Sequence, residues 1–301
     1  MSFFQEKGAG MMRKFTAVTL FFFAVLFISS GTAFGLAVSA TGDGALLVNT
    51  ILGSGITVSN ISYNGGANAS GTFTDGLSSG IGMDTGIILT SGSAAGAVGP
   101  NDSDSYSVTN GLGGDADLAG LIPGYSVNDA TVLEFDFEST GGDLYFNFVF
   151  GSEEYNEWVD SSFNDVFGFF LDGINIGLIT GTTTPVTIDN VNLGDNSEYY
   201  NNNDPGDLGS PTPYYLQYDG FTDVFTAEAL GLTAGSHHIK LAIADAGDFI
   251  YDSGVFIQGG SFSDKPPEPP GGPAPVPEPG TFVLLGSGLV GLVLYRRKFK
   301  K

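Results

Sequence analysis

Apolar and polar residues alternate with a period of two in several separate segments of the chain. In TVLEFDFE (131–138), Leu133, Phe135 and Phe137 fall on one face, and acidic side chains dominate the other. Similar alternation or short apolar runs cover residues 56–63, 86–92, 144–150, 238–245 and 255–262. A period of two with one apolar face predicts strands that expose their other face to water. Many such strands, separated by turns rich in Gly, Asn and Asp, predict an all-β, mostly antiparallel β-sandwich or jelly-roll-like domain.

One short helix is expected near the start of this domain. Asp43 is a suitable N-cap residue, the segment ALLVNTIL follows at 45–52, and Gly53 is suited to end the helix. Two loops rich in Asp, Asn, Ser and Gly, at 99–118 and 194–213, interrupt the strands. Loops of this length in a compact domain tend to be functional or mobile.

The N-terminal 40 residues have the pattern of a secretory signal peptide. Arg13 and Lys14 precede an apolar run, and small residues follow it. We expect cleavage after Ala33 or Ala40, which implies export through the Sec translocon and processing by signal peptidase. The expected organisation is therefore a signal region at 1–40, a β domain at 41–264, a Pro-rich linker at 265–275 and a separate tail at 276–301.

The tail carries an apolar segment followed by basic residues. The segment at 281–295 predicts a membrane helix, and its apolar core of about 14 residues spans roughly 21 Å, against about 30 Å of hydrocarbon in a bilayer. It is therefore short for a permanent anchor. The basic residues that follow are expected to stay on the cytoplasmic side, which gives an N-out, C-in topology.

The same tail resembles the PEP-CTERM sorting signal of Gram-negative bacteria. The motif Val276-Pro277-Glu278-Pro279 is followed by the apolar segment and by Arg296-Arg297, in the order typical of that signal. The resemblance implies a transient anchor in the inner membrane that an exosortase-type membrane protease removes. It also implies delivery to the cell surface or the extracellular matrix, in the context of exopolysaccharide and biofilm production.

Charge is distributed very unevenly along the 301 residues. The formal net charge is −23, and residues 34–265 contain 30 of the 33 acidic residues but only two of the ten basic ones. This region, near −28, repels nucleic acid and anionic lipid headgroups and attracts cations. A solvated acidic surface and acidic loops that hold calcium are both consistent with it. The absence of cysteine excludes disulfides, a thiol nucleophile and Cys-ligated zinc.

The central region resembles the choice-of-anchor L domain. Its most specific segments are GSEEYNEWV (151–159) and FNDVFGFFLDG (163–173). The residues that carry the resemblance are Ser152, Glu153, Glu154, Tyr155, Asn164, Asp165, Asp219, Gly220, Asp245, Asp248 and Asp252. Such domains occur with different surface-sorting tails. The resemblance therefore implies surface display and carries no known chemistry.

Calcium binding is one hypothesis for the acidic signature residues. Calcium takes six to eight oxygen ligands, which carboxylate-rich loops can supply. The candidate sets are Glu153, Glu154 and Asp165, or alternatively Asp245, Asp248 and Asp252, and the pairs Asp102/Asp104 and Asp115/Asp117 are further candidates. The competing explanation is that these carboxylates accept backbone N–H groups and so close strand ends and turns.

Catalysis has weaker support in the sequence. Glu153 and Glu154 are adjacent, so in an extended segment they point to opposite faces and do not form a glycosidase pair with each other. One of them paired with Asp165 or Asp172 keeps a glycan hydrolase open. His237 and His238 open a strand, and no nucleophile motif accompanies them.

Aromatic residues near the same stretch suggest a further alternative. Trp158, Tyr155 and Phe163 are candidates for a sugar-binding platform, or else for core and lid positions. The sequence as a whole favours a non-enzymatic surface or matrix protein, structural or adhesive in an exopolysaccharide layer. The alternatives are a calcium-dependent carbohydrate-binding module and a glycan hydrolase that uses Glu153 or Glu154. The ligand, the physiological role and the oligomeric state stay open.

Overall fold

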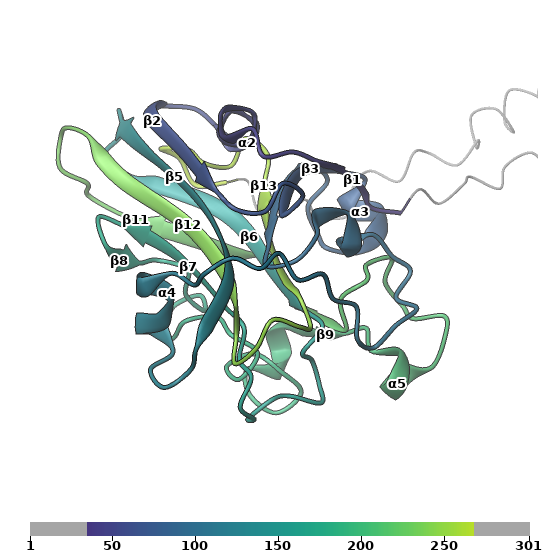
Figure 1. Ribbon diagram of the computed structural model, residues 1–301. Helices are drawn as coiled ribbons and strands as arrows, with labels where there is room; N and C mark the ends of the chain where they lie inside the picture. Colours follow the sequence, from purple (N-terminus) through teal and green to yellow (C-terminus); the bar gives the residue numbers. More distant parts are fainter. Residues whose placement is uncertain (1–34, 268–301) are drawn as a thin grey trace, which may run out of the picture.

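Two antiparallel β-sheets face each other in the computed structural model, which describes residues 35–267 (Figure 1). The first sheet has the order β1 (Ala37–Ala40), β3 (Ser70–Thr74), β4 (Gly86–Thr90), β13 (Ser253–Gln258), β6 (Leu144–Ser152), β10 (Gly220–Thr222) and β9 (Tyr200–Asn202), and β11 (Phe225–Ala229) also pairs with β6. The second has the order β2 (Ile56–Asn64), β5 (Val127–Ser139), β12 (His237–Ala246), β7 (Val166–Leu171) and β8 (Ile174–Asn175). The predicted all-β, antiparallel sandwich is confirmed.

Aromatic side chains fill the space between the sheets. The inward positions of β6 are Leu144, Phe146, Phe148 and Phe150, all fully buried. They meet Phe167 and Phe169 of β7, and the rings of Phe148 and Phe169 lie 5.0 Å apart in an edge-to-face arrangement. Each fully buried Phe contributes about 1.5–3 kcal/mol relative to an exposed one, so this aromatic layer dominates the stability of the core.

The first sheet is covered on both faces, which the alternation did not predict. Residues of β4, β6 and β13 that point away from the sandwich core, such as Ile88, Val149 and Phe256, are also fully buried. They pack with Phe73 and Tyr218 in a second cluster, near the short elements α3 (Gly76–Ser79) and η1 (Ala94–Ala97). The expectation of strands half exposed to water is therefore wrong for this sheet, because loop-borne side chains supply an outer apolar layer.

The second sheet keeps the predicted alternation more closely. Leu133, Phe135 and Phe137 of β5 are buried, whereas Glu134 and Asp136 on the opposite face are partly exposed. Part of that outer face lies under a short helix, α4 (Ala116–Leu121), whose Leu118 packs in a third apolar cluster. This helix begins at the end of the predicted 99–118 loop and was missed, because it has only six residues.

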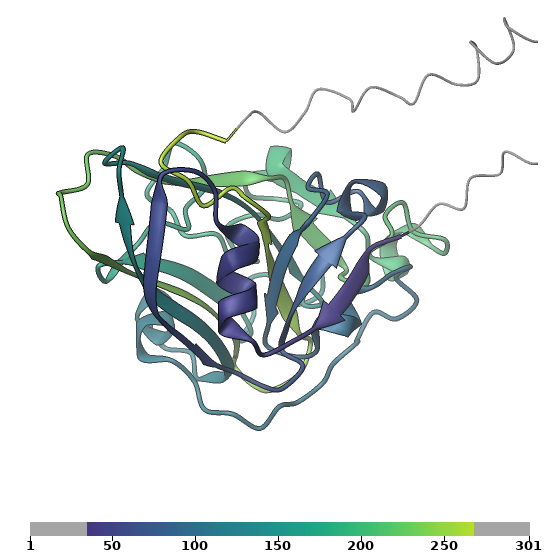
Figure 2. The same ribbon diagram turned by 90° about the horizontal axis from the view of Figure 1, so that it is seen from above.

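The predicted N-terminal helix is confirmed as α2 (Gly44–Ile51). Asp43 is its N-cap, and its Oδ1 accepts the backbone N–H groups of Ala45 and Leu46 at 3.0 and 3.2 Å. Leu47, Val48 and Ile51 are fully buried, and Figure 2 shows the helix lying at one side of the molecule between strands of the two sheets. The remaining short helical elements are α5 (Pro205–Leu208) and η2 (Ser197–Tyr199).

Both ends of the chain lie beyond the described part. The signal region up to residue 34, most of the linker, the apolar segment 281–295 and the sorting motif are outside residues 35–267. Within that range, no helix has the length and apolar character needed to cross a membrane.

Candidate functional site

The first sheet ends in a row of three buried carboxylates. Ser152, the last residue of β6, pairs with the first residue of β10 on one side and the first residue of β13 on the other. The next residues beyond this pairing are Glu153, Asp219 and Asp252, which therefore lie side by side across three strands. Their exposed fractions are 0 %, 0 % and 2 %. We call them the first carboxylate row.

A similar row ends the second sheet. Ala244 of β12 pairs with Val166 of β7, so the residues just beyond that pair, Asp245 and Asp165, lie opposite each other. Asp129 of β5 lies on the other side of Asp245, after a bulge in the pairing of the two strands. All three side chains are buried. We call them the second carboxylate row.

A long extended segment, residues 101–112, is held along these rows, and we call it the strap. Hydrogen bonds to the first row come from the Asn101 side-chain amide, which donates to Asp219, and from two backbone N–H groups: Tyr106 donates to Glu153 and Val108 donates to Asp252. The backbone N–H groups of Asn110 and Leu112 both donate to Asp129 of the second row. From Tyr106 on, every second backbone N–H therefore meets a carboxylate, as it would meet carbonyl groups at the edge of a sheet. Figure 2 shows the strap passing around the outside of both sheets.

The rows explain most of the signature residues structurally. Side-chain carboxyl oxygens that accept backbone N–H groups satisfy donors that no carbonyl group pairs with. Glu154 joins the rows, because its Oε2 accepts the Asp165 N–H at 2.9 Å while Ser152 Oγ accepts the Glu154 N–H. Asp165 Oδ1 in turn accepts the Ala246 N–H at 2.8 Å. These contacts support the second of the two explanations for the acidic residues.

Burial raises the pKa of these carboxyl groups. Desolvation is the largest cause, and it raises the pKa of Asp252 to about 7, of Asp219 to about 8 and of Glu154 to about 9. The pKa of Glu153 is also raised, by burial and then by the neighbouring charge of Asp219. The N–H donors lower the pKa values but do not outweigh burial. At neutral pH several of these groups therefore hold a proton.

The remaining signature residues lie close to the rows, with one exception. Tyr155 is fully buried in the core beside Tyr200, and a Cβ on Gly220 would clash with both rings. Asn164 is buried next to Asp165. Asp248, in contrast, lies in the loop after β12, and its Oδ1 accepts the Ile250 N–H of the same loop.

The residues of each predicted calcium-binding set do not lie together in the structure. Glu153 lies with Asp252, and Asp165 lies with Asp245, because strand pairing rather than sequence proximity sets the neighbours. Among residues 35–267, no group of three or more His, Asp or Glu side chains is arranged so that it could hold a metal ion. The pair Asp115/Asp117 instead binds Lys240, at 2.7 and 2.6 Å from its Nζ.

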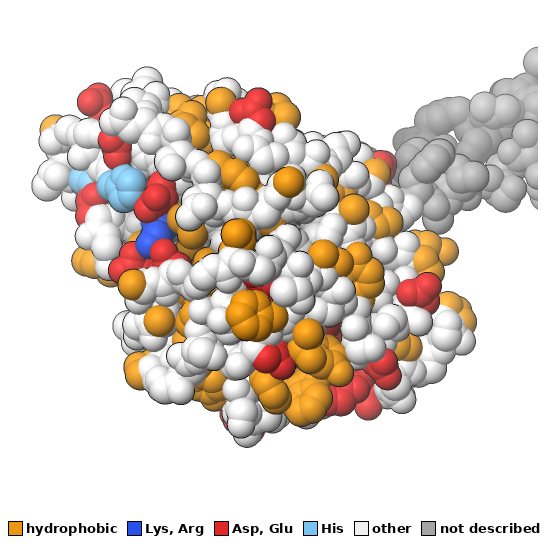
Figure 3. All heavy atoms as spheres, in the orientation of Figure 1, with side chains coloured by type: hydrophobic (Ala, Val, Ile, Leu, Met, Phe, Trp, Pro, Cys, Tyr) orange, Lys and Arg blue, Asp and Glu red, His pale blue; other side chains and the backbone are white. Residues whose placement is uncertain are grey.

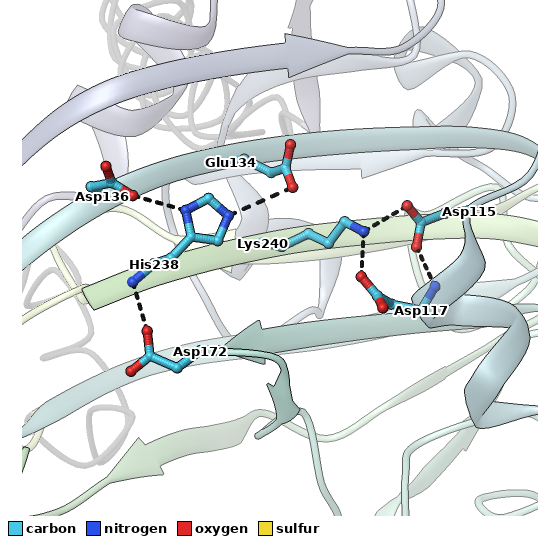
Figure 4. A network of polar contacts seen from close by, with 7 residues as sticks. All are labelled: Asp115, Asp117, Glu134, Asp136, Asp172, His238 and Lys240. Carbon is cyan, nitrogen blue, oxygen red and sulfur yellow. Dashed lines mark hydrogen bonds and ion pairs between the residues drawn. The ribbon is translucent and has the colours of Figure 1, made fainter. Parts of the chain in front are cut away.

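The two histidines point to opposite faces of the second sheet: His238 lies on the outer face (Figure 4), whereas His237 is buried beside the ring of Phe137. His238 Nδ1 lies 2.8 Å from Asp136 Oδ1, and its other ring nitrogen lies 3.6 Å from Glu134. His237 bonds to Asp172 through Nδ1 at 2.7 Å. Among the described residues, the ring hydrogen bonds run from His237 to Asp172 and to the Thr233 carbonyl, and from His238 to Asp136, so none of them involves a hydroxyl group.

Trp158 lies outside the rows, in a cluster of aromatic rings. Its ring packs edge-to-face on Phe163 at 5.0 Å and lies 5.7 Å from Tyr251, and all three are half-buried. Phe249 and Ile250, on the neighbouring loop, are 40 % and 44 % exposed. Figure 3 shows hydrophobic and acidic side chains gathered side by side on the lower part of one face.

Two features of the site escaped the sequence analysis. Asp129 accepts two strap N–H groups, and its backbone has a positive φ of 47°. It lies just before the alternating segment 131–138 and had no pattern of its own. The strap appeared only as a long polar loop. The donors that alternate along the strap are backbone N–H groups, which every residue except proline has, so no pattern of side chains in the sequence predicts them.

Two known families match the chain. The choice-of-anchor L domain matches residues 38–263, and the PEP-CTERM protein-sorting motif matches residues 275–298. No match was found among curated proteins or among solved structures. The sorting motif marks the protein for export and for membrane-anchored sorting to the cell surface, and both families concern anchoring and sorting rather than catalysis. Since the first match covers about three quarters of its length, the chain belongs to the choice-of-anchor L domain family.

Proposed function

We propose that the exported domain is a non-enzymatic, structural or adhesive component of an exopolysaccharide or biofilm layer at the cell surface. The observation that carries this proposal is the burial of the family's most specific acidic residues. Glu153 and Glu154 are 0 % and 1 % exposed. Buried carboxyl groups of this kind stabilise the fold and hold the strap, and a polymer at the protein surface cannot contact them.

The same burial argues against a glycan hydrolase. Such an enzyme needs two carboxyl groups that face one sugar ring. A surface hollow of about 430 Å³ near the aromatic cluster is lined by Tyr125, Ser126, Ser161, Ser162 and two glycines, without a carboxylate. We expect no polysaccharide turnover by the protein. A turnover that Glu153→Gln or Glu154→Gln abolishes would contradict this part of the proposal.

The proposed route to the surface uses both ends of the chain. The Sec translocon exports the N-terminus, and signal peptidase removes the leader. The tail then anchors the protein N-out, C-in in the inner membrane until an exosortase-type protease cuts near Pro277-Glu278-Pro279. The match to the sorting motif supports this route.

Binding of a glycan through the aromatic cluster is the second candidate. It is favoured by the exposure of Phe249 and Ile250 next to Trp158, Phe163 and Tyr251, since contiguous apolar surface rimmed by polar groups marks interaction sites. The strongly negative charge of the region disfavours an anionic polymer as the partner.

Fractionation of producing cells tests the main proposal. We expect the wild-type protein, shortened by the tail, in the matrix fraction together with polysaccharide. A variant with Pro277→Ala and Glu278→Ala should stay full-length in the membrane fraction. Recovery of the full-length wild-type chain in the membrane would show a permanent anchor instead.

A binding assay separates the structural from the adhesive role. If adhesion uses the aromatic cluster, Trp158→Ala should reduce retention on immobilised neutral polysaccharide at least tenfold, because a few large aromatic side chains carry most of the binding energy at such surfaces. Tyr215→Ala, an exposed aromatic elsewhere, is the matched control. Equal retention of both variants and the wild type would contradict adhesion through the aromatic cluster and favour a purely structural role.

A further inference from the structure

A group of oxygen atoms without hydrogen-bond partners lies between the second carboxylate row and the start of β13 in the first sheet. Asp165 and Asp245 face each other across β7 and β12 of the second sheet. Ser253, at the start of β13, belongs to the first sheet. Within residues 35–267, the atoms Asp165 Oδ2, Asp245 Oδ1, Asp245 Oδ2 and Ser253 Oγ have no hydrogen-bond partner.

These oxygens are deeply buried. Asp165 and Ser253 are 0 % exposed and Asp245 is 1 % exposed. Ser91 and Ser253 lie close enough to affect the pKa of Asp245 and Asp165, yet neither forms a hydrogen bond of ordinary geometry with them. Leaving even one buried polar group unpaired costs about 1–3 kcal/mol, and more when the group is charged. Four unpaired oxygen atoms in one place therefore indicate a site that binds a ligand.

Within residues 35–267, no positively charged side chain forms an ion pair with these carboxylates. Burial is the largest cause of the raised pKa values of Asp165 and Asp245, and the charges that raise them further are other carboxylates: Glu154 and Asp252 for Asp165, and Asp165, Asp252 and Asp129 for Asp245. Lys240 is held by Asp115 and Asp117 on the outer face. The compensating charge must therefore come from the solvent, as protons or as a bound cation.

We propose that a calcium ion binds between Asp165 and Asp245, with the Ser253 hydroxyl as a further ligand. Calcium prefers oxygen ligands and accepts carboxylate, hydroxyl and carbonyl oxygens in flexible geometry. Two carboxylates match its charge, and neutral oxygens complete the shell, which agrees with the lack of a three-carboxylate group among the described residues. The all-oxygen set does not suit zinc, which favours nitrogen and sulfur ligands.

The ion's position defines its role. The ligands come from both sheets and lie in the buried interior, so the ion joins the sheets and does not reach a glycan outside. Glu154 supports the site by accepting the Asp165 N–H. Extracellular modules bind calcium with dissociation constants of about 10⁻⁴–10⁻³ M. The proposal does not depend on the adhesive or structural role of the protein.

Thermal unfolding of the full-length chain, purified in detergent, tests the site. At pH 7.5 we expect calcium chloride to raise Tm by roughly 5–10 °C over EDTA, when free calcium exceeds its dissociation constant about 100-fold. Asp245→Asn and Asp165→Asn should lose this rise. Magnesium chloride should give a much smaller effect, because Mg²⁺ demands octahedral geometry and retains its water.

Asp248→Asn is the matched control, because Asp248 lies three residues from Asp245 but in the loop after β12, where its Oδ1 accepts the Ile250 N–H. It should keep the full calcium effect. If the Asp variants do not fold, Ser253→Ala should show at least a threefold weaker calcium affinity, and the wild type should hold one calcium per chain after dialysis against calcium. Coincident midpoints of the wild type in calcium and EDTA, or an undiminished rise in Asp245→Asn, would overturn the proposal.

Discussion

At the scale of single residues, the domain uses carboxylates as replacements for backbone carbonyl groups. Asp129 shows this most clearly. Its two oxygens accept the N–H groups of Asn110 and Leu112, and its left-handed backbone aims the side chain at the strap. Asp and Asn are the side chains, apart from Gly, that best tolerate this conformation. Asp129 thus supplies both acceptor oxygens and adopts the left-handed backbone that directs them to the strap.

Replacing Asp129 should loosen the strap. We expect Asp129→Ala to lower the free energy of unfolding by about 2–4 kcal/mol, because two N–H groups lose their acceptor and Ala is strained at positive φ. Asp129→Asn, which keeps the shape and one acceptor oxygen, should cost about half as much. Urea unfolding measures both. Asp160→Ala is the control, since Asp160 is exposed with a φ of 60°; a loss as large there would show that backbone strain alone explains the effect.

The raised pKa of Asp219 predicts how stability depends on pH. Its folded-state pKa, about 8, lies above its ordinary value because of burial, so folding takes up a proton between about pH 4 and 8. The stability it contributes is therefore present at low pH and lost as the pH rises through 8. We expect Tm to fall from pH 5 to pH 9, and Asp219→Asn to flatten that fall.

The exposed Asp223→Asn substitution is the control for this pH profile. Asp223 lies four residues from Asp219 and is exposed, so its replacement should leave the slope of Tm against pH unchanged. A wild-type Tm that rises from pH 5 to pH 9 would contradict the expected sign.

At the scale of elements, the strap is an ordered segment without regular secondary structure. Its N–H groups at Tyr106 and Val108 donate to side-chain carboxylates, so the segment does not count as a paired strand. Sequence patterns identified the strands and α2, because apolar periodicity and the Asp43 cap are local signals. They missed the strap and the outer layer on the first sheet, because both depend on residues distant in the chain.

Hydrogen exchange checks the order of the strap. The amides of Tyr106, Val108 and Asn110 should exchange roughly 100-fold or more slowly than an unprotected amide, as about 3 kcal/mol of opening free energy requires. Ser107 and Thr109, whose N–H groups donate to none of the carboxylates, should exchange faster. Uniformly fast exchange from 101 to 112 would show that the strap is mobile in solution.

At the scale of the whole molecule, the position of β1 in the first sheet distinguishes between the two expected cleavage sites of the proposed signal peptide. Residues Ala37–Ala40 form β1, which pairs with β3 along its whole length. Cleavage after Ala40 would remove this strand and expose the edge of β3, whereas cleavage after Ala33 preserves it. The family match, which begins at residue 38, agrees with the longer domain.

Processing of the exported protein should therefore begin the mature chain at Phe34. Intact-mass measurement of the protein released from cells identifies the first residue. A mature chain that begins at Thr41 would show that β1 is dispensable. In that case a chain shortened to Thr41 should unfold at the same urea concentration as one that begins at Phe34.

The sequence by itself determined the fold class, the N-terminal helix, the sorting tail and the family, because these rest on local periodicity, capping and contiguous motifs. It did not determine which carboxylates become neighbours. Glu153 and Glu154 are adjacent in the chain, yet Glu153 lies with Asp219 and Asp252, while Glu154 lies with Asp165. Strand pairing brings together residues from distant segments, and burial then changes their protonation. Only the tertiary structure could therefore turn an apparent active-site motif into two rows of acceptors and a proposed calcium site.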